Sequence, residues 1–356
     1  MRISDSSLAA NFDYLNKGTA SANFAMVMST GIVSVALHLL GCNWGAMLLF
    51  YINIIMFLWL WAMYIRKALK YPATMLKDFK GHLSGPGFLT IVAGTCILGS
   101  QFATLAHNVT IAEWLFWLGV WCWIFILWGT FFFIFTVQEK PPLAKGINGA
   151  WLVATVSTQS IVILGATIAK DVGWNLEISF YLLCALFVLG LMLYILVITS
   201  IFFRYCFAEM LPAEMNPTYW IDAGAVAIST LAGATLILHY GETPMLDHFM
   251  PYIKGTTLLT WATASFWVPM LFLFGIWRHV IKGYTFSYTA AFWGMVFPMG
   301  MYTACTATFS RALKFSWLMD IPHWFIWIAL IAWTATFIGM LLTRWRILVR
   351  GPKTQN

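Results

Sequence analysis

Long apolar runs separated by short polar links dominate the hydrophobic pattern of this chain. A transmembrane helix needs about 20 mostly apolar residues, and ten runs reach that length. We place these runs near residues 22–42, 44–66, 85–107, 112–136, 146–169, 176–203, 219–239, 253–277, 287–308 and 321–344. Several neighbouring runs are only a few residues apart, and such short links favour antiparallel hairpins. The pattern therefore predicts an all-α integral membrane protein whose ten transmembrane helices form five helical hairpins.

The same pattern predicts one transmembrane domain between two short tails. The ten-helix domain covers residues 22–344, the N-terminal tail covers residues 1–21, and the C-terminal tail covers residues 345–356. We expect the protein to be embedded in the lipid bilayer, with no separate soluble domain.

The ten apolar runs fall into two alternating sets that differ in the bulk of their side chains. The odd-numbered runs, counted from the first, are rich in glycine, serine and threonine, whereas the even-numbered runs are bulky and hold most of the tryptophans. Only three of the 20 tryptophans fall in odd-numbered runs. Small residues let helix backbones approach closely, and hydroxyl groups need partners that lipid cannot supply. We therefore predict that the odd helices lie inside and line a central pore, with the even helices outside. The alternative is that the small residues only pack helices together.

Composition narrows the class of protein further. Of the 356 residues, 61% are hydrophobic and 9% are charged, whereas soluble proteins average about 45–50% apolar and about 25% charged residues. This excludes an ordinary soluble enzyme, a disordered chain and a nucleic-acid-binding protein. The six cysteines contain no CxxC pair and mostly fall in apolar runs. We expect no disulfide framework, no metal site and no cofactor.

The positive charges predict an orientation. The net charge is +7, and 16 of the 20 Lys and Arg residues fall on the side of the predicted bundle that holds both termini. Lysine and arginine accumulate in cytoplasmic loops of membrane proteins. The sequence therefore predicts a multi-pass protein of the plasma (inner) membrane with both termini in the cytoplasm. The basic face would also concentrate anions at the inner mouth of a pore.

Candidate groups for an anion path come from the odd-numbered runs. No Lys or Arg lies in the middle of a predicted span, which argues against an ion-pair pump and against a fixed cationic site. Hydroxyl groups and freed backbone N–H groups can still donate hydrogen bonds to an anion. Asp222, the main acid close to a span, is interpreted as a helix N-terminal residue. The pore-lining candidates are Ser29, Thr30, Gly31, Thr95, Thr158, Ser229, Thr230 and Thr303.

Three histidines fall at the outer ends of odd-numbered runs: His38, His107 and His239. Histidine titrates near neutral pH, so these residues are candidates for a pH-sensitive outer vestibule. The simpler interpretation is that they are interfacial residues without a role.

Four short motifs, all in or at the start of odd-numbered runs, carry a resemblance to a known family. Residues 24–34 (FAMVMSTGIVS) resemble the Met-Gly-Thr-Gly-Ile-x-Ser stretch of the tellurite-resistance/dicarboxylate transporter family, with Ser29 at a usual glycine. His82 followed by residues 85–87 (GPG), residues 217–224 (PTYWIDAG) and residues 292–299 (FWGMVFPM) are similar to three further motifs of that family. The family includes fungal malic acid and sulfite transporters, the bacterial TehA channel and plant guard-cell slow anion channels.

The resemblance implies five helical hairpins in a quasi-fivefold arrangement, a pore through the inner helices, and a homotrimer with one pore in each subunit. It also implies a phenylalanine that plugs the pore, which falls on Phe297, directly before Pro298. Proline kinks a helix, and a kink can turn the neighbouring ring into the lumen. The alternative is that Phe297 packs against another helix.

We therefore expect a passive channel or facilitator for small anions or organic acids, with a phenylalanine gate. The alternative is a proton-coupled transporter or exporter of dicarboxylate, sulfite or tellurite-related anions. That alternative needs a proton site, for which the sequence offers only the rim histidines. An enzyme is disfavoured, and we expect no catalytic residues, because the predicted spans are nearly devoid of the titratable groups that polytopic enzymes use.

Overall fold

The computed structural model describes residues 5–351, so residues 1–4 and 352–356 of the two predicted tails lie outside the described residues. Within the described range the chain is helical and contains no β-strand. The predicted all-α class is confirmed. A short helix, α1 (Asp5–Lys17), precedes the apolar bundle.

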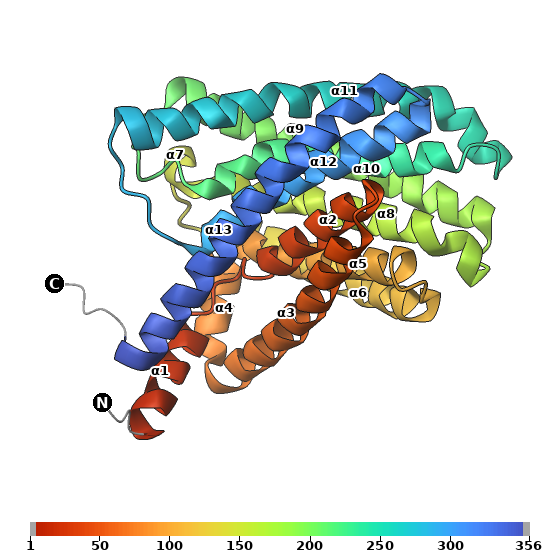
Figure 1. Ribbon diagram of the computed structural model, residues 1–356. Helices are drawn as coiled ribbons and strands as arrows, with labels where there is room; N and C mark the ends of the chain where they lie inside the picture. Colours follow the sequence, from red (N-terminus) through yellow and green to blue (C-terminus); the bar gives the residue numbers. More distant parts are fainter. Residues whose placement is uncertain (1–4, 352–356) are drawn as a thin grey trace.

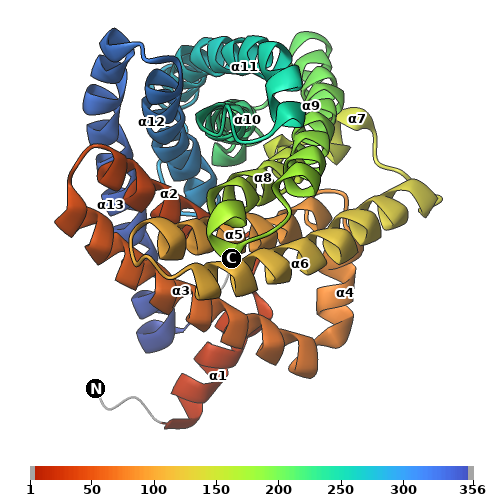
Figure 2. The same ribbon diagram turned by 90° about the vertical axis from the view of Figure 1, so that its right-hand side faces the viewer.

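Within residues 5–351, five helices contact one another in a closed ring, each touching the next and the last touching the first. Figure 2 shows one of them, α10, close to end-on. We call these helices the inner helices. They are α2 (Ala25–Leu39), α5 (Thr90–Thr104), α8 (Val153–Val172), α10 (Ile221–Leu238) and α12 (Trp293–Leu313).

Each inner helix packs against the long helix that follows it in the chain. Figure 2 shows α9 and α11 outside α10. We call these long helices the outer helices. They are α3 (Asn43–Lys70), α6 (Val109–Thr136), α9 (Leu176–Phe207), α11 (Pro244–Ile276) and α13 (Asp320–Arg350).

The inner helices are much more buried than the outer helices, as the size of their side chains requires. In α5, α8 and α10, with the turns that precede them, 83–94% of the most apolar window is buried, against 28–44% in the outer helices. The bulky residues of the outer helices make up the exposed face: Trp114 and Trp128 of α6 are 74% and 71% exposed. Small side chains allow the inner helices to pack on every side, whereas large apolar side chains suit contact with lipid.

Eight helices of the described chain are long and apolar enough to cross a membrane. They are the five outer helices together with α5, α8 and α10 and the turns before them. The inner helix α2 has 15 residues, or about 22 Å at about 1.5 Å per residue. The inner helix α12 carries hydroxyl groups along a buried surface, which lowers its hydropathy without exposing polar groups to lipid.

Most inner helices begin with a tight turn. These turns are η1 (Gly85–Leu89), η2 (Gly149–Leu152), η3 (Pro217–Trp220) and η5 (Ala290–Phe292). The side chains of Asn148 and Asn216 accept hydrogen bonds from the backbone N–H groups of Ala150 and Thr218 and so fix the first turn of η2 and η3. A Cβ atom at Gly149 would overlap the carbonyl group of Thr218, so two neighbouring inner helices begin in close backbone contact.

Short helices complete the links between hairpins. They are α4 (Pro72–Lys80), α7 (Leu143–Gly146) and the π-helical turn η4 (Trp277–Ile281), while η6 (Ser316–Met319) joins α12 to α13 within the last hairpin. The two ends of the described chain lie side by side, as Figure 1 shows for α1 and the end of α13. Asn11 of α1 donates a hydrogen bond to the carbonyl oxygen of Leu348, 3.0 Å away, and Asp13 pairs with Arg66 and Lys70 of α3.

Candidate functional site

Phe297 lies in the contact between two inner helices. Its side chain is fully buried on α12, and Pro298 follows it inside the helix. Gly224 of α10 faces this pair: a Cβ atom at position 224 would lie 3.0 Å from Cδ1 and Cε1 of Phe297 and 2.7 Å from Cγ of Pro298. The ring of Phe297 therefore packs against a neighbour within the inner ring.

The start of α12 is also held by α2, on the other side of the ring. Ser29 Oγ lies 2.7 Å from the carbonyl oxygen of Trp293, one turn before Phe297, and 2.6 Å from the carbonyl oxygen of Ala25 in its own helix. Ser29 is the residue that departs from the family's usual glycine, and it ties α2 to the turn that precedes the proline. The turn of α12 that begins at Trp293 is thus tied to α2, and Phe297, one turn later, packs against Gly224 of α10.

Polar side chains join each outer helix to the inner helix of the next hairpin. In three such pairs a tryptophan indole N–H of the outer helix donates to a threonine hydroxyl, and in the other two an amide or a tyrosine hydroxyl is the donor. The pairs are Trp333–Thr30 (2.9 Å), Trp123–Thr158 (2.9 Å), Trp261–Thr306 (3.1 Å), Asn53–Gln101 (2.7 Å) and Tyr205–Asp222 (2.6 Å). These bonds satisfy hydroxyl and amide groups that lipid could not satisfy.

These contacts divide the predicted pore-lining residues into two groups. Thr30 and Thr158 accept hydrogen bonds from outer-helix tryptophans, and Thr230 donates to Thr260 of α11 at 2.9 Å. Gly31 lies where α2 packs against both α5 and α3, because a Cβ atom there would lie 2.5 Å from Cγ2 of Ile97 on α5 and 2.9 Å from Nδ2 of Asn53 on α3. The hydroxyl-rich pattern of the odd-numbered runs therefore also includes residues that bond the inner helices to the outer helices.

In the described part of the chain, the hydroxyl groups of the other four candidates bond only to inner helices. Ser29 contacts α2 and α12, while Thr95, Ser229 and Thr303 donate to carbonyl groups of their own helices at 2.7 Å, 2.8 Å and 3.0 Å. All four side chains are buried. Each hydroxyl hydrogen is directed at a backbone carbonyl in this conformation.

The three rim histidines lie where inner helices end. His38 Nδ1 is 3.0 Å from Oδ1 of Asn43, and His239 Nδ1 is 3.1 Å from Oε2 of Glu242. His107 has a positive φ of 50° in the link after α5. Within residues 5–351 no hydrogen bond joins one of these histidines to another.

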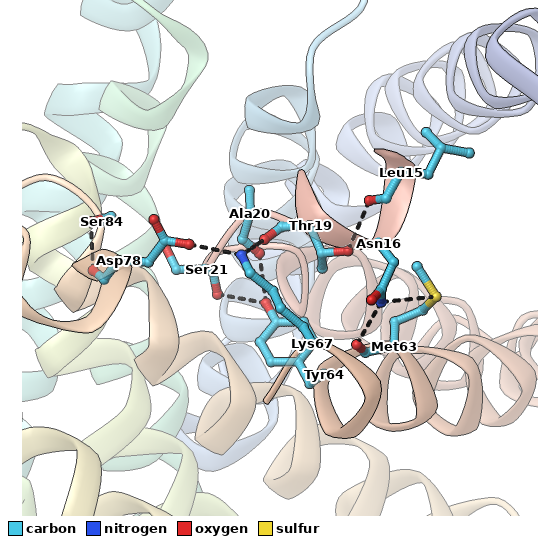
Figure 3. A network of polar contacts seen from close by, with 10 residues as sticks. All are labelled: Leu15, Asn16, Thr19, Ala20, Ser21, Met63, Tyr64, Lys67, Asp78 and Ser84. Atoms are coloured by element: carbon cyan, nitrogen blue, oxygen red, sulfur yellow. Dashed lines mark hydrogen bonds and ion pairs between the residues drawn. The ribbon is translucent and has the colours of Figure 1, made fainter. Parts of the chain in front are cut away.

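A buried lysine fastens the segment that leads into α2. Lys67 is 3% exposed, and its Nζ donates to the carbonyl oxygen of Thr19 at 2.6 Å and to Oδ2 of Asp78 at 2.7 Å. The hydroxyl of Tyr64, one turn earlier on α3, donates to the carbonyl oxygen of Ala20 at 2.7 Å. Figure 3 shows both side chains of α3 reaching the same stretch of backbone.

In two other hairpins, an arginine holds the segment that leads into the inner helix. Arg204, near the end of α9, donates to the carbonyl oxygen of Ile147 at 2.6 Å, and Arg278, in η4, donates to that of Met215 at 2.6 Å. In each case the outer helix clamps the segment leading into the inner helix of its own hairpin. The sequence interpretation treated these cations only as rim charges. Their position within one or two residues of the end of an even-numbered run is the signal that could have identified them.

Asp222 lies in the first turn of α10, as interpreted from the sequence, but its side chain turns toward α9. The carboxylate is fully buried, and its Oδ2 accepts a hydrogen bond from the hydroxyl of Tyr205 at 2.6 Å. Its Oδ1 has no hydrogen-bond partner in the described part of the chain. The hydroxyl of Tyr194, which accepts from Trp267 Nε1 at 3.2 Å, lies 3.4 Å from the backbone oxygen of Asp222.

The fold and these contacts define an integral membrane protein in which a buried ring of small-residue helices is surrounded by apolar helices. The family model of voltage-dependent anion channels matches residues 19–341. The chain therefore belongs to that family, as the four motifs predicted, and is a membrane transporter or anion channel.

Individual relatives agree with this assignment. An uncharacterized transporter of Methanocaldococcus jannaschii is 24% identical over 334 residues, which cover 90% of this chain and 94% of the relative. A second uncharacterized transporter of the same organism is 24% identical over 328 residues, or 88% of this chain and 90% of the relative. An uncharacterized membrane protein of Mycobacterium tuberculosis is 32% identical over 149 residues, or 42% of this chain and 75% of the relative.

Proposed function

We propose that this protein is a passive channel or facilitator for small anions or organic acids, and that the anions cross the membrane through the ring of inner helices. In this proposal α2 and α12 cross together with the eight helices that have the length and hydropathy of spans. Membership of the anion channel family supports the choice of ion. The closed ring of buried inner helices supports the choice of path.

The observation that carries the proposal is the placement of Phe297. Its ring occupies the space between α12 and α10, and Gly224 leaves room for it there. We propose that this ring is the gate and that Pro298, which removes a backbone hydrogen bond inside α12, helps to aim it toward the path. Opening then requires the ring to move away from Gly224.

The residues proposed to line the path are those whose hydroxyl groups form no hydrogen bond with an outer helix of the described chain. Ser29, Thr95, Ser229 and Thr303 qualify because their hydroxyls engage only inner helices. When an anion passes, these hydroxyls exchange a carbonyl partner for the anion, and selectivity among small anions is weak because no side chain of fixed positive charge takes part. His38, His107 and His239 form the outer vestibule in this proposal.

We also propose an orientation in the membrane and an oligomeric state. We place the protein in the plasma (inner) membrane with both termini in the cytoplasm, since Lys67, Arg204 and Arg278 and most other cations then lie at the cytoplasmic side. A homotrimer with one path in each subunit follows from the family resemblance.

A second candidate is a proton-coupled transporter of dicarboxylate, sulfite or tellurite-related anions. The specific observation in its favour is the buried carboxylate of Asp222, which supplies the titratable group within the membrane that this mechanism needs.

Electrical recording separates the two candidates. Purified protein in planar bilayers would be bathed in chloride, nitrate, sulfite or malate at equal pH on both sides. A passive channel gives current whose reversal potential follows the anion gradient. If anions instead accumulate against their gradient only when a pH gradient is applied to proteoliposomes, the carrier is correct and the passive proposal is wrong.

A further inference from the structure

The environment of Asp222 differs from that of the other buried charged residues. Lys67 and Arg204 each pair with a carboxylate, whereas Asp222 forms no ion pair with any residue in the range 5–351. One carboxylate oxygen accepts from Tyr205, and the other has no hydrogen-bond partner among the described residues. An ionised carboxylate buried without a cation is strongly disfavoured, and binding a proton removes that cost and supplies a donor.

Titratable and charged groups around Asp222 are few or already engaged. Arg204 of α9 is hydrogen-bonded to Ile147 and the hydroxyl of Tyr219, and pairs with Glu214 at 3.2 Å. Arg278 of η4 is bonded to the carbonyl of Met215. Other titratable groups at this end of the bundle are Tyr194, Tyr205 and Cys206 on α9, Tyr219 in η3 and His279 in η4.

The remaining titratable residues of the neighbouring helices lie farther along them. Those of α8 and α12 occur from the middle of the helix onward, and the others of α11 occur in its first third, before the hairpin brings that helix back to this end. They are Lys170 and Asp171 in α8, Tyr302, Cys305 and Arg311 in α12, and Asp247, His248, Tyr252 and Lys254 in α11. Those of α9, which are Glu177, Tyr181 and Cys184, also occur in the first third of their helix.

We propose that Asp222 is a proton-binding site inside the membrane domain, and that the bound proton favours passage of anions past Phe297. The second part rests on the proposed function of Phe297 as a gate, whereas the first part does not. The ligand of this site is the proton itself, held by a carboxylate with a tyrosine hydroxyl beside it.

The link to the gate follows from the first turn of α10. Asp222 and Gly224 are two residues apart, so they point to opposite sides of the helix: Asp222 faces Tyr205 on α9, and Gly224 faces Phe297 on α12. A negative charge on Asp222 therefore lies about one helix diameter, about 10 Å, from the gate. It repels an anion there, and a proton removes the repulsion. Anion flux should accordingly rise as the pH falls.

The size of the effect follows from Coulomb's law. One unit charge about 10 Å away, at an effective dielectric constant of about 20, changes the population of an anion at the gate on the order of tenfold. We expect a change of this order in chloride flux between the protonated and ionised forms of Asp222.

Infrared titration tests the proton site without reference to transport. In wild-type protein, the carbonyl band of a protonated carboxylic acid should appear as the pH falls. The band should be missing in Asp222→Asn and present, at a changed frequency, in Asp222→Glu. Tyr205→Phe keeps the ring but removes the donor to the ionised carboxylate, so it should move the midpoint of this titration to higher pH. A wild-type band that Asp222→Asn leaves unchanged would overturn the site.

Flux measurements test the link to the gate. Chloride efflux from proteoliposomes would be followed at equal pH on both sides, so that neither a pH gradient nor protonation of the substrate contributes. Wild-type flux should rise about tenfold across the titration, and Asp222→Asn should hold the high value at every pH. If the infrared band is lost in Asp222→Asn but its flux keeps the wild-type pH profile, the site stands and the link to the gate is wrong.

Discussion

Gly224 of α10 lies against the ring of Phe297 of α12 so closely that a Cβ atom at position 224 would stand 3.0 Å from two ring carbons. The same atom would stand 2.7 Å from Cγ of Pro298. Two inner helices thus meet at a glycine, a phenylalanine and a proline. The position of the Phe297 side chain depends on the absence of a side chain at Gly224. The packing of the inner helices is therefore linked to the proposed gate.

Replacing that glycine should disturb the gate. In Gly224→Ala the new methyl group requires the ring of Phe297 or the start of α12 to shift, so we expect a higher basal anion flux than in the wild type. Gly255→Ala is the matched control, since Gly255 of α11 has open space where its Cβ atom would lie. Chloride efflux from proteoliposomes measures both. Equal flux in the two variants would show that the Gly224 contact does not hold the gate closed.

The hydrogen bonds between layers should contribute to stability. Trp333→Phe keeps an aromatic ring but removes the indole donor to Thr30, and we expect a loss of about 1 kcal/mol. Trp327→Phe on the same helix is the control, because Trp327 is 62% exposed. Thermal unfolding in detergent compares them. An unchanged unfolding temperature for Trp333→Phe would mean that this bond contributes no stability.

The hydrogen bonds of Lys67 should contribute more to the stability of the protein than an exposed lysine on a nearby helix does. Lys67→Met leaves Asp78 and the carbonyl of Thr19 without their donor, and because Asp78 is only partly buried we expect a loss of roughly 1–3 kcal/mol. Lys77→Met, at an exposed position of α4, should have little effect. Adding Asp78→Asn to Lys67→Met should recover part of the loss, and the same unfolding measurement checks all three. Equal stabilities for the two single variants would contradict the clamp.

The orientation can be checked by labelling. Single cysteines would be introduced at Lys77 and Lys254 after the exposed Cys206 has been replaced by serine. A membrane-impermeant thiol reagent added to intact cells should modify position 254 and leave position 77 unmodified. Labelling at position 77 alone would reverse the orientation.

The sequence predicted the helices well because a span and a buried helix both need long apolar runs. The run at 112–136 corresponds to α6 (Val109–Thr136), for example. The run at 253–277 begins nine residues later than α11, which starts at Pro244. Asp247 and His248 interrupt the apolar pattern there, so hydropathy missed the first turns of a helix that begins outside the most apolar window.

The direction of individual side chains could not be predicted in the same way. Thr30 and Ser29 are adjacent in the sequence and chemically alike, yet Thr30 bonds to an outer helix and Ser29 to an inner one. Successive residues of a helix point about 100° apart, so the side that a hydroxyl faces depends on which helices surround it. Asp222 illustrates the same limit: its place in the first turn was predicted, but its contact with Tyr205 depends on how α9 packs.

The most direct test of the account is the chloride flux of Phe297→Ala compared with wild type and with Phe309→Ala. Phe309 is also a buried phenylalanine of α12, but its ring lies beside Trp261 of the outer helix α11, with ring centres 6.3 Å apart. The two variants lose the same atoms from the same helix. The account predicts that Phe297→Ala increases the flux severalfold in proteoliposomes and that Phe309→Ala does not. If Phe297→Ala leaves the flux at the wild-type level while the protein remains folded, Phe297 is not the gate.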